Sequence, residues 1–120
     1  MTNKDLSQIH YLKKEIELNE RRLKELNNNL NNPMFLKDNN GDAMKIQYLE
    51  TKVNSLKNEL FEEMIAIQEY INNIQDSLVR MIITLRFVEC YSWDEVAIAV
   101  GGGNSYDGIK KIYYRYIKNN

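Results

Sequence analysis

The chain has 120 residues, of which 43% are hydrophobic and 28% are charged. This length can supply one modest hydrophobic core and excludes two substantial domains, so we expect one compact unit with a long extension. The formal charge is −1, from 16 basic and 17 acidic side chains. This balance excludes a protein that binds polyanions through its overall charge, and it leaves room for a local basic face.

Cysteine content and apolar runs indicate the compartment. The single cysteine, Cys90, has no partner for a disulfide within the chain, and residues 1–5 lead directly into a polar helical pattern unlike a signal peptide. The apolar run at 81–83 is interrupted by Thr84 and Arg86, far short of the roughly 20 residues that cross a bilayer. We therefore expect a soluble cytoplasmic protein with no membrane partner.

Apolar residues recur at alternating steps of three and four from Ile9 to Leu30, which is the pattern of a coiled-coil seam. Asn19 interrupts this seam, and it either fixes register or oligomeric state or is a solvated interruption of the surface. The helix is expected to end in the asparagine-rich run 27–32 before Pro33, because asparagine competes for backbone hydrogen bonds and proline restricts the residue before it.

A loop of roughly ten residues should follow, and a second helix is expected over 42–74 with Asp42 as its candidate N-cap. Because its seam has the same period as the first, the two favour an antiparallel hairpin over residues 1–75. We interpret this hairpin as a spacer, or as a surface for a homodimer or a partner protein. The C-terminal end of the second helix carries apolar residues that the C-terminal region or a second subunit must cover: Met64, Ile67, Tyr70 and Ile74.

Residues 76–120 form the second predicted region, which begins with a helix capped by Asp76 or Ser77. The predicted apolar stripe of this helix comprises Leu78, Met81, Ile82, Leu85 and Val88. Ser92 and Glu95 have the spacing of a capping box and predict a short helix after it. That helix should end at the glycines 101–103 and turn Val96, Ala97 and Val100 inward.

A final helix is expected after Asn104 or Ser105, with an inward stripe of Ile109, Ile112, Tyr113, Tyr116 and Ile117. Two short helices separated by a glycine turn have the outline of a helix-turn-helix. Residues 104–120 contain four basic and one acidic side chain, whereas residues 1–74 contain ten basic and twelve acidic ones. A cationic helix on a small helical scaffold suits the major groove of DNA. The alternative is a C-terminal helix whose basic residues only complement the helix dipole.

The run 85–101, followed by Ser105 and 109–111, resembles region 4 of sigma-70-type bacterial sigma factors. It is more similar still to small phage-encoded regulators that carry this module behind a helical hairpin, including those related to the ArpU and RinA late transcription regulators. The resemblance rests on Leu85 to Phe87, Ser92-Trp93 and Val96-Ala97. It implies sequence-specific binding of double-stranded DNA by residues 105–118 in a phage or prophage regulator, acting in the bacterial host cytoplasm with RNA polymerase as a candidate partner.

The candidate DNA-binding residues are Ser105, Tyr106, Lys110, Lys111, Tyr114, Arg115 and Lys118. The resemblance gives packing roles to Trp93, Val96, Ala97, Ile109 and Ile112. Two features depart from the tighter versions of the motif: the glycines 101–103 lengthen the turn, and Gly108 lies inside the proposed recognition helix. Asp107 would repel phosphate unless it accepts from a cytosine amino group or caps the helix.

No pattern indicates an enzyme, a metal site or a cofactor. His10 has no second histidine or cysteine at ligand spacing, and Cys90 has no base beside it in the predicted fold. The glycines 101–103 follow no strand and precede no Gly-Lys-Ser/Thr run, which argues against a phosphate-binding loop. A second class of function stays open, in which the protein is an interaction or DNA-packaging subunit whose helix-turn-helix reads no promoter.

Overall fold

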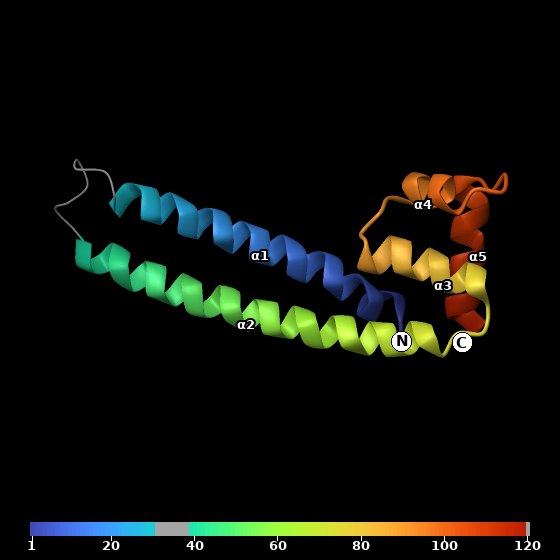
Figure 1. Ribbon diagram of the computed structural model, residues 1–120, viewed down its shortest axis with the longest axis horizontal. Helices are drawn as coiled ribbons and strands as arrows, with labels where there is room; N and C mark the ends of the chain where they lie inside the picture. Colours follow the sequence, from blue (N-terminus) through green and yellow to red (C-terminus); the bar gives the residue numbers. More distant parts are fainter. Residues whose placement is uncertain (31–38, 120) are drawn as a thin grey trace. The chain divides into compact units, whose positions relative to one another are not determined.

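A computed structural model describes residues 1–30 and 39–119 of the chain. Its elements are α1 (Asn3–Leu30), α2 (Asn39–Asn72), α3 (Ser77–Ile83), the π-helical turn η2 (Thr84–Val88), α4 (Trp93–Val100) and α5 (Tyr106–Asn119) (Figure 1). The predicted all-α class, with a long pair of helices at its start, is confirmed. Most of the predicted loop between Pro33 and Asp42 lies outside the described residues, and its last residues, 39–41, are helical instead. No helix in the described ranges is long and apolar enough to cross a membrane.

Contacts divide the chain into two compact units. The hairpin unit comprises residues 11–61, and the C-terminal unit comprises residues 62–120 together with residues 1–10. The predicted regions, 1–75 and 76–120, divide the chain at a different place, and they stay a prediction about roles. The first turns of α1 and the last turns of α2 therefore belong to the C-terminal unit, and the rest of the helical pair forms a unit of its own.

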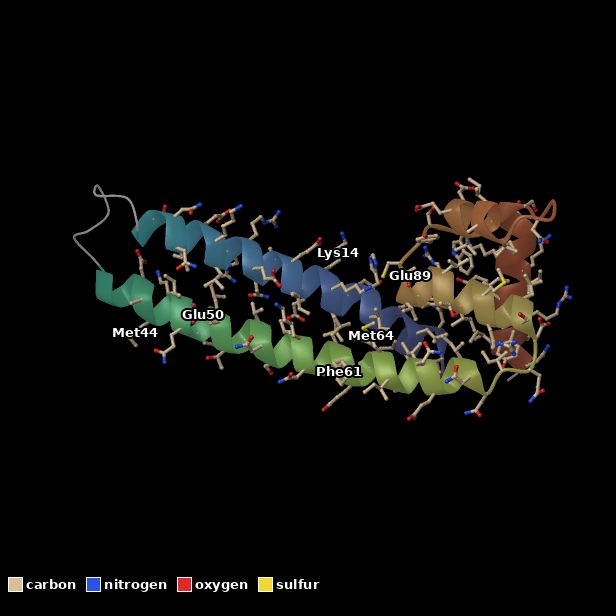
Figure 2. The ribbon with its side chains drawn as sticks, in the orientation of Figure 1. Lys14, Met44, Glu50, Phe61, Met64 and Glu89 are labelled. Carbon is tan, nitrogen blue, oxygen red and sulfur yellow. The ribbon has the colours of Figure 1, made fainter. Side chains whose placement is uncertain are left out.

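Within the hairpin unit, α1 and α2 run antiparallel and bury their seams against each other (Figure 1). The buried seam contains Leu12, Ile16, Val53 and Leu56, with Leu60 packed against it. Lys57 Nζ lies 3.4 Å from Glu20 Oε1 across the two helices, an exposed ion pair that contributes little stability. Lys14 and Met44 lie on the outward sides of the two helices in Figure 2, and Met44 is 73% exposed. The apolar seam therefore holds this unit together.

Asn19 lies in this buried seam and is 2% exposed. Its Nδ2 donates to the Glu15 carbonyl oxygen at 2.8 Å, while its Oδ1 has no hydrogen-bond partner among the described residues. The interpretation of Asn19 as a solvated interruption is therefore wrong. A role in fixing register or oligomeric state stays a prediction, and the unpaired carbonyl oxygen carries a desolvation cost.

The bounds of α2 differ from the expected ones at both ends. The helix begins at Asn39, so Asp42 lies in its first turn and the predicted cap at Asp42 is wrong. Asp42 still complements the helix dipole there. The helix ends at Asn72. Just after it, the Ile74 amide donates a hydrogen bond to the carbonyl oxygen of Ile71, three residues before it, at 3.0 Å. Arg80 Nη1 then donates to the Ile74 carbonyl oxygen at 2.6 Å, which closes this end of the helix.

The C-terminal unit has its own hydrophobic core, which covers the apolar end of α2. Ile67 is 0% exposed and Ile74 is 3% exposed. Tyr70 lies beside Tyr116 of α5, and burial, followed by this neighbour, raises the Tyr70 pKa. The expectation that the C-terminal region covers this surface is confirmed. The core also takes in the start of the chain, because Leu6 is fully buried.

The helix before α4 buries a different stripe from the predicted one. Asp76 caps α3 by accepting from the Leu78 amide at 2.8 Å, as expected. Its buried residues, with that of η2, are Val79, Ile82, Ile83 and Phe87, whereas Met81 is 43% exposed. The difference already lies within α3, where the helix turns Val79 rather than Met81 toward the core. The predicted inward position of Met81 is wrong.

Candidate nucleic-acid interface

The turn before α5 is built from three glycines and two polar side chains. Gly101, Gly102 and Gly103 all have positive φ, from 67° to 76°, a region that other residues rarely adopt. Gly101 closes α4 as predicted, with its amide donating to the Ala97 carbonyl oxygen at 3.1 Å. Asn104 Nδ2 donates to the Gly101 carbonyl oxygen at 2.8 Å, which holds the turn closed.

Ser105 caps α5. Its Oγ accepts from the Gly108 amide at 3.1 Å, and the Ile109 amide donates to its carbonyl oxygen at 3.0 Å. A Cβ added at Gly108 would lie 3.2 Å from this Oγ, a tight contact that glycine avoids. The helix thus begins at Tyr106, and the Ser105 hydroxyl, a candidate DNA contact, is already engaged in the cap.

α4 positions α5 through its own start and its buried face. Ser92 and Glu95 form the predicted capping box: the Ser92 Oγ accepts from the Glu95 amide at 3.2 Å, and Glu95 Oε1 accepts from the Ser92 amide at 3.0 Å. Behind this start, Trp93, Val96 and Ala97 are buried. Because α3, α4 and α5 contact one another pairwise, the three helices form one scaffold.

An aromatic cluster fixes the inner side of α5. Tyr113 is 0% exposed, and its ring centre lies 5.2 Å from that of Phe87 and 5.4 Å from that of Trp93. Tyr114 extends the cluster outward, 6.3 Å from Trp93 and 45% exposed. The predicted inward stripe holds at Ile109 and Tyr113, which are buried, while Ile112, Tyr116 and Ile117 are half-buried.

The candidate DNA-binding side chains lie along the outer side of α5 and at its start. Ser105, Tyr106, Lys111, Tyr114, Arg115 and Lys118 are exposed, and Lys110 is half-buried. Lys110 Nζ lies 3.4 Å from the Tyr106 hydroxyl and 5.4 Å from the centre of its ring, so these two side chains form a pair. Lys111, Arg115 and Lys118 make no ion pair with any residue in the described ranges. Their charges are therefore available to a partner.

Helix geometry places the acidic residue and two of the basic residues of α5 on one outward face. At about 100° per residue, side chains 4, 7 and 11 positions apart lie nearly above one another. Asp107, Lys111, Tyr114 and Lys118 have this spacing, opposite the buried Ile109 and Tyr113. We call these four residues the outer face of α5. It extends over about 17 Å, a length that a major groove accepts.

The junction between η2 and α4 was missed by sequence reasoning. Arg86 Nη1 donates to the Tyr91 carbonyl oxygen at 2.8 Å, and its guanidinium lies 4.9 Å from the centre of the Trp93 ring. Cys90 has a φ of +61°, a left-handed conformation that is uncommon for residues with a side chain. Arg86 therefore contacts both the turn, at Tyr91, and the first residue of α4, Trp93. The sequence contained one signal for it, an arginine a few residues before a tryptophan.

Tyr113 also ties α5 to the start of the chain. Its hydroxyl donates to Asn3 Oδ1 at 2.6 Å, a contact between residues 110 positions apart. Burial raises the Tyr113 pKa, because ionisation would leave a charge inside the core. Leu6 and Ile9 are fully buried in the same unit. No local pattern could have revealed this contact, because its two partners lie at opposite ends of the sequence.

No group of three or more histidine, cysteine, aspartate or glutamate side chains that could hold a metal ion occurs among the residues that the structure describes. Comparison with models of protein families, with curated proteins and with solved structures found no match to this chain.

Proposed function

We propose that this protein is a sequence-specific DNA-binding transcription regulator, of the phage or prophage type that its resemblance to sigma region 4 implies. In this proposal α4, the glycine turn and α5 act as a helix-turn-helix, and α5 enters the major groove. The observation that carries the proposal is the outer face of α5, where Lys111 and Lys118 are exposed and make no ion pair with a described residue.

Two further observations support this proposal. Basic side chains concentrate on α5, which carries Lys110, Lys111, Arg115 and Lys118 in a chain of net charge −1. A local cationic helix attracts phosphate groups, and the rest of the chain, which is acidic on balance, does not attract them. The scaffold behind α5 is packed, with Ile109 and Tyr113 fully buried, so α5 would meet DNA as a preorganised helix.

The test is electrophoretic mobility of random-sequence duplexes with the full chain at low salt. Changing Lys110→Ala with Lys111→Ala should weaken binding and reduce the slope of log affinity against log salt by up to about two, because each lysine that contacts phosphate releases about one counterion. The exposed pair Lys24 and Lys45 in the hairpin unit, changed in the same way, is the matched control and should leave the slope unchanged. Equal slopes for both double variants would reject this assignment.

A second candidate function is protein–protein interaction through the hairpin, as in an assembly or DNA-packaging subunit. Exposed apolar side chains on the hairpin unit favour it, since Met44 and Tyr48 lie one turn apart on α2 and are 73% and 64% exposed. In that case a hairpin variant such as Met44→Ala with Tyr48→Ala would change the oligomeric state or partner capture, and no duplex would be retained even at low salt.

A further inference from the structure

Asp107 lies on the outer face of α5, and the structure removes one of the two roles that the sequence left open for it. The cap of α5 is Ser105, whose Oγ accepts the Gly108 amide. No hydrogen bond or ion pair within the described ranges engages the Asp107 carboxylate, which is exposed in the first turn. Its acceptor oxygens are therefore free at the N-terminal end of α5. In a recognition helix, residues at this end contact the base edges.

The neighbours of Asp107 on the outer face are basic or aromatic. Lys111 lies one turn further along, and Lys118 lies in the last turn. Lys110, in contrast, is paired with Tyr106. A carboxylate and an uncommitted lysine thus stand one turn apart, about 6 Å along the helix axis, as an acceptor beside a donor.

Base-edge chemistry restricts what an acceptor can meet in the major groove. Guanine presents two acceptors there and thymine presents one with a methyl group, so a carboxylate would be repelled by both. Adenine offers an amino donor beside the N7 acceptor, and cytosine offers its N4 amino group without an adjacent acceptor. The guanine opposite cytosine then presents O6 and N7 to a lysine. A carboxylate next to a lysine therefore fits a C·G pair better than any other.

We propose that Asp107 is a specificity-determining residue, which selects a cytosine by accepting from its N4 amino group while Lys111 donates to the paired guanine or its neighbour. This inference rests on the proposed function, since it names the base that the same face would read. The proposal also explains why an acidic side chain stands among the lysines of α5. The Asp107 carboxylate weakens binding to every site that lacks the amino donor.

The experiment selects duplexes from a random pool with the full-length protein and sequences those retained. We expect one position fixed as C·G, and about a tenfold or greater loss of affinity when that pair alone is replaced. Asp107→Asn should shift the preference at this position toward A·T, because an amide pairs with both N6 and N7 of adenine. Asp107→Ala should lose the preference there and leave the other selected positions unchanged.

Asp94→Asn is the matched control, because it removes one exposed carboxylate from the first turn of α4. It should leave the selected sequence unchanged. If Asp107→Asn and Asp94→Asn select the same sequence as the parent, or Asp107→Asn only lowers the melting temperature, Asp107 serves the helix dipole and the inference is overturned. If the parent retains duplexes without a fixed C·G pair, the inference fails while the proposed function stands. Retention of no duplex at low salt overturns the proposed function itself.

Discussion

Tyr113 is a buried phenol whose hydroxyl donates a hydrogen bond to Asn3, at the other end of the chain. We expect Tyr113→Phe to lower the free energy of unfolding by about 1 kcal/mol at neutral pH, because the ring still fills its place and only the hydrogen bond is lost. Urea unfolding followed by the fluorescence of Trp93, the single tryptophan, measures this change in the C-terminal unit. An unchanged unfolding midpoint would mean that the contact with Asn3 contributes nothing.

The raised pKa of Tyr113 predicts a second difference in stability between the parent and Tyr113→Phe, at alkaline pH. The unfolded phenol ionises near its ordinary pKa of 10.0, whereas the buried phenol stays protonated to a higher pH. The stability that this group contributes is therefore fully present below the ordinary pKa of 10.0 and is lost as the pH rises from there through the raised pKa. The parent should lose more stability than Tyr113→Phe above about pH 10, because Tyr113→Phe lacks this phenol.

At the scale of the element, the start of α4 depends on the capping box. Hydrogen bonds from the Ser92 amide, and then from its hydroxyl, lower the pKa of Glu95. Its contribution to stability is therefore present above the ordinary carboxyl pKa and is lost as the pH falls through the lowered one. Glu95→Gln keeps an acceptor for the Ser92 amide and removes the titration. Its melting temperature should fall less than that of the parent on acidification below about pH 5.

The control for this comparison is Asp94→Asn, which removes a carboxylate from the same turn outside the capping box. It should follow the parent on acidification. If Glu95→Gln and the parent lose the same stability between neutral and acid pH, the box contributes no pH dependence, although its hydrogen bonds can still fix where α4 begins.

At the scale of the whole molecule, the first turns of α1 belong to the C-terminal unit. Leu6→Ala with Ile9→Ala should destabilise that unit by about 2 kcal/mol or more per site, since both side chains are fully buried. The midpoint of Trp93 fluorescence on urea unfolding should fall accordingly. Leu18→Ala is the control, because Leu18 is 46% exposed on the same helix. A Trp93 midpoint equal to the parent's would show that residues 76–120 fold without the start of the chain.

Much of the local structure could be predicted from the sequence because its causes are local. The capping box at Ser92, the cap at Asp76 and the glycine turn each depend on residues within a few positions of one another. The seams of α1 and α2 follow from periodicity, and so does the outward position of the basic residues on α5. The errors have different causes: α2 continued upstream of Asp42, and α3 turned Val79 rather than Met81 toward the core.

Taken by itself, the sequence determined the helical class, the order of the helices and the cationic character of α5, because spacing and charge are properties of neighbouring residues. The tertiary structure alone decided that residues 1–10 complete the core behind α5, that Asn19 is buried, and which of the two expected residues, Asn104 or Ser105, caps α5. These outcomes depend on which surfaces and atoms meet after packing. Contacts between distant segments, and the choice between neighbouring residues that could make the same contact, depend on the whole fold and leave no local pattern.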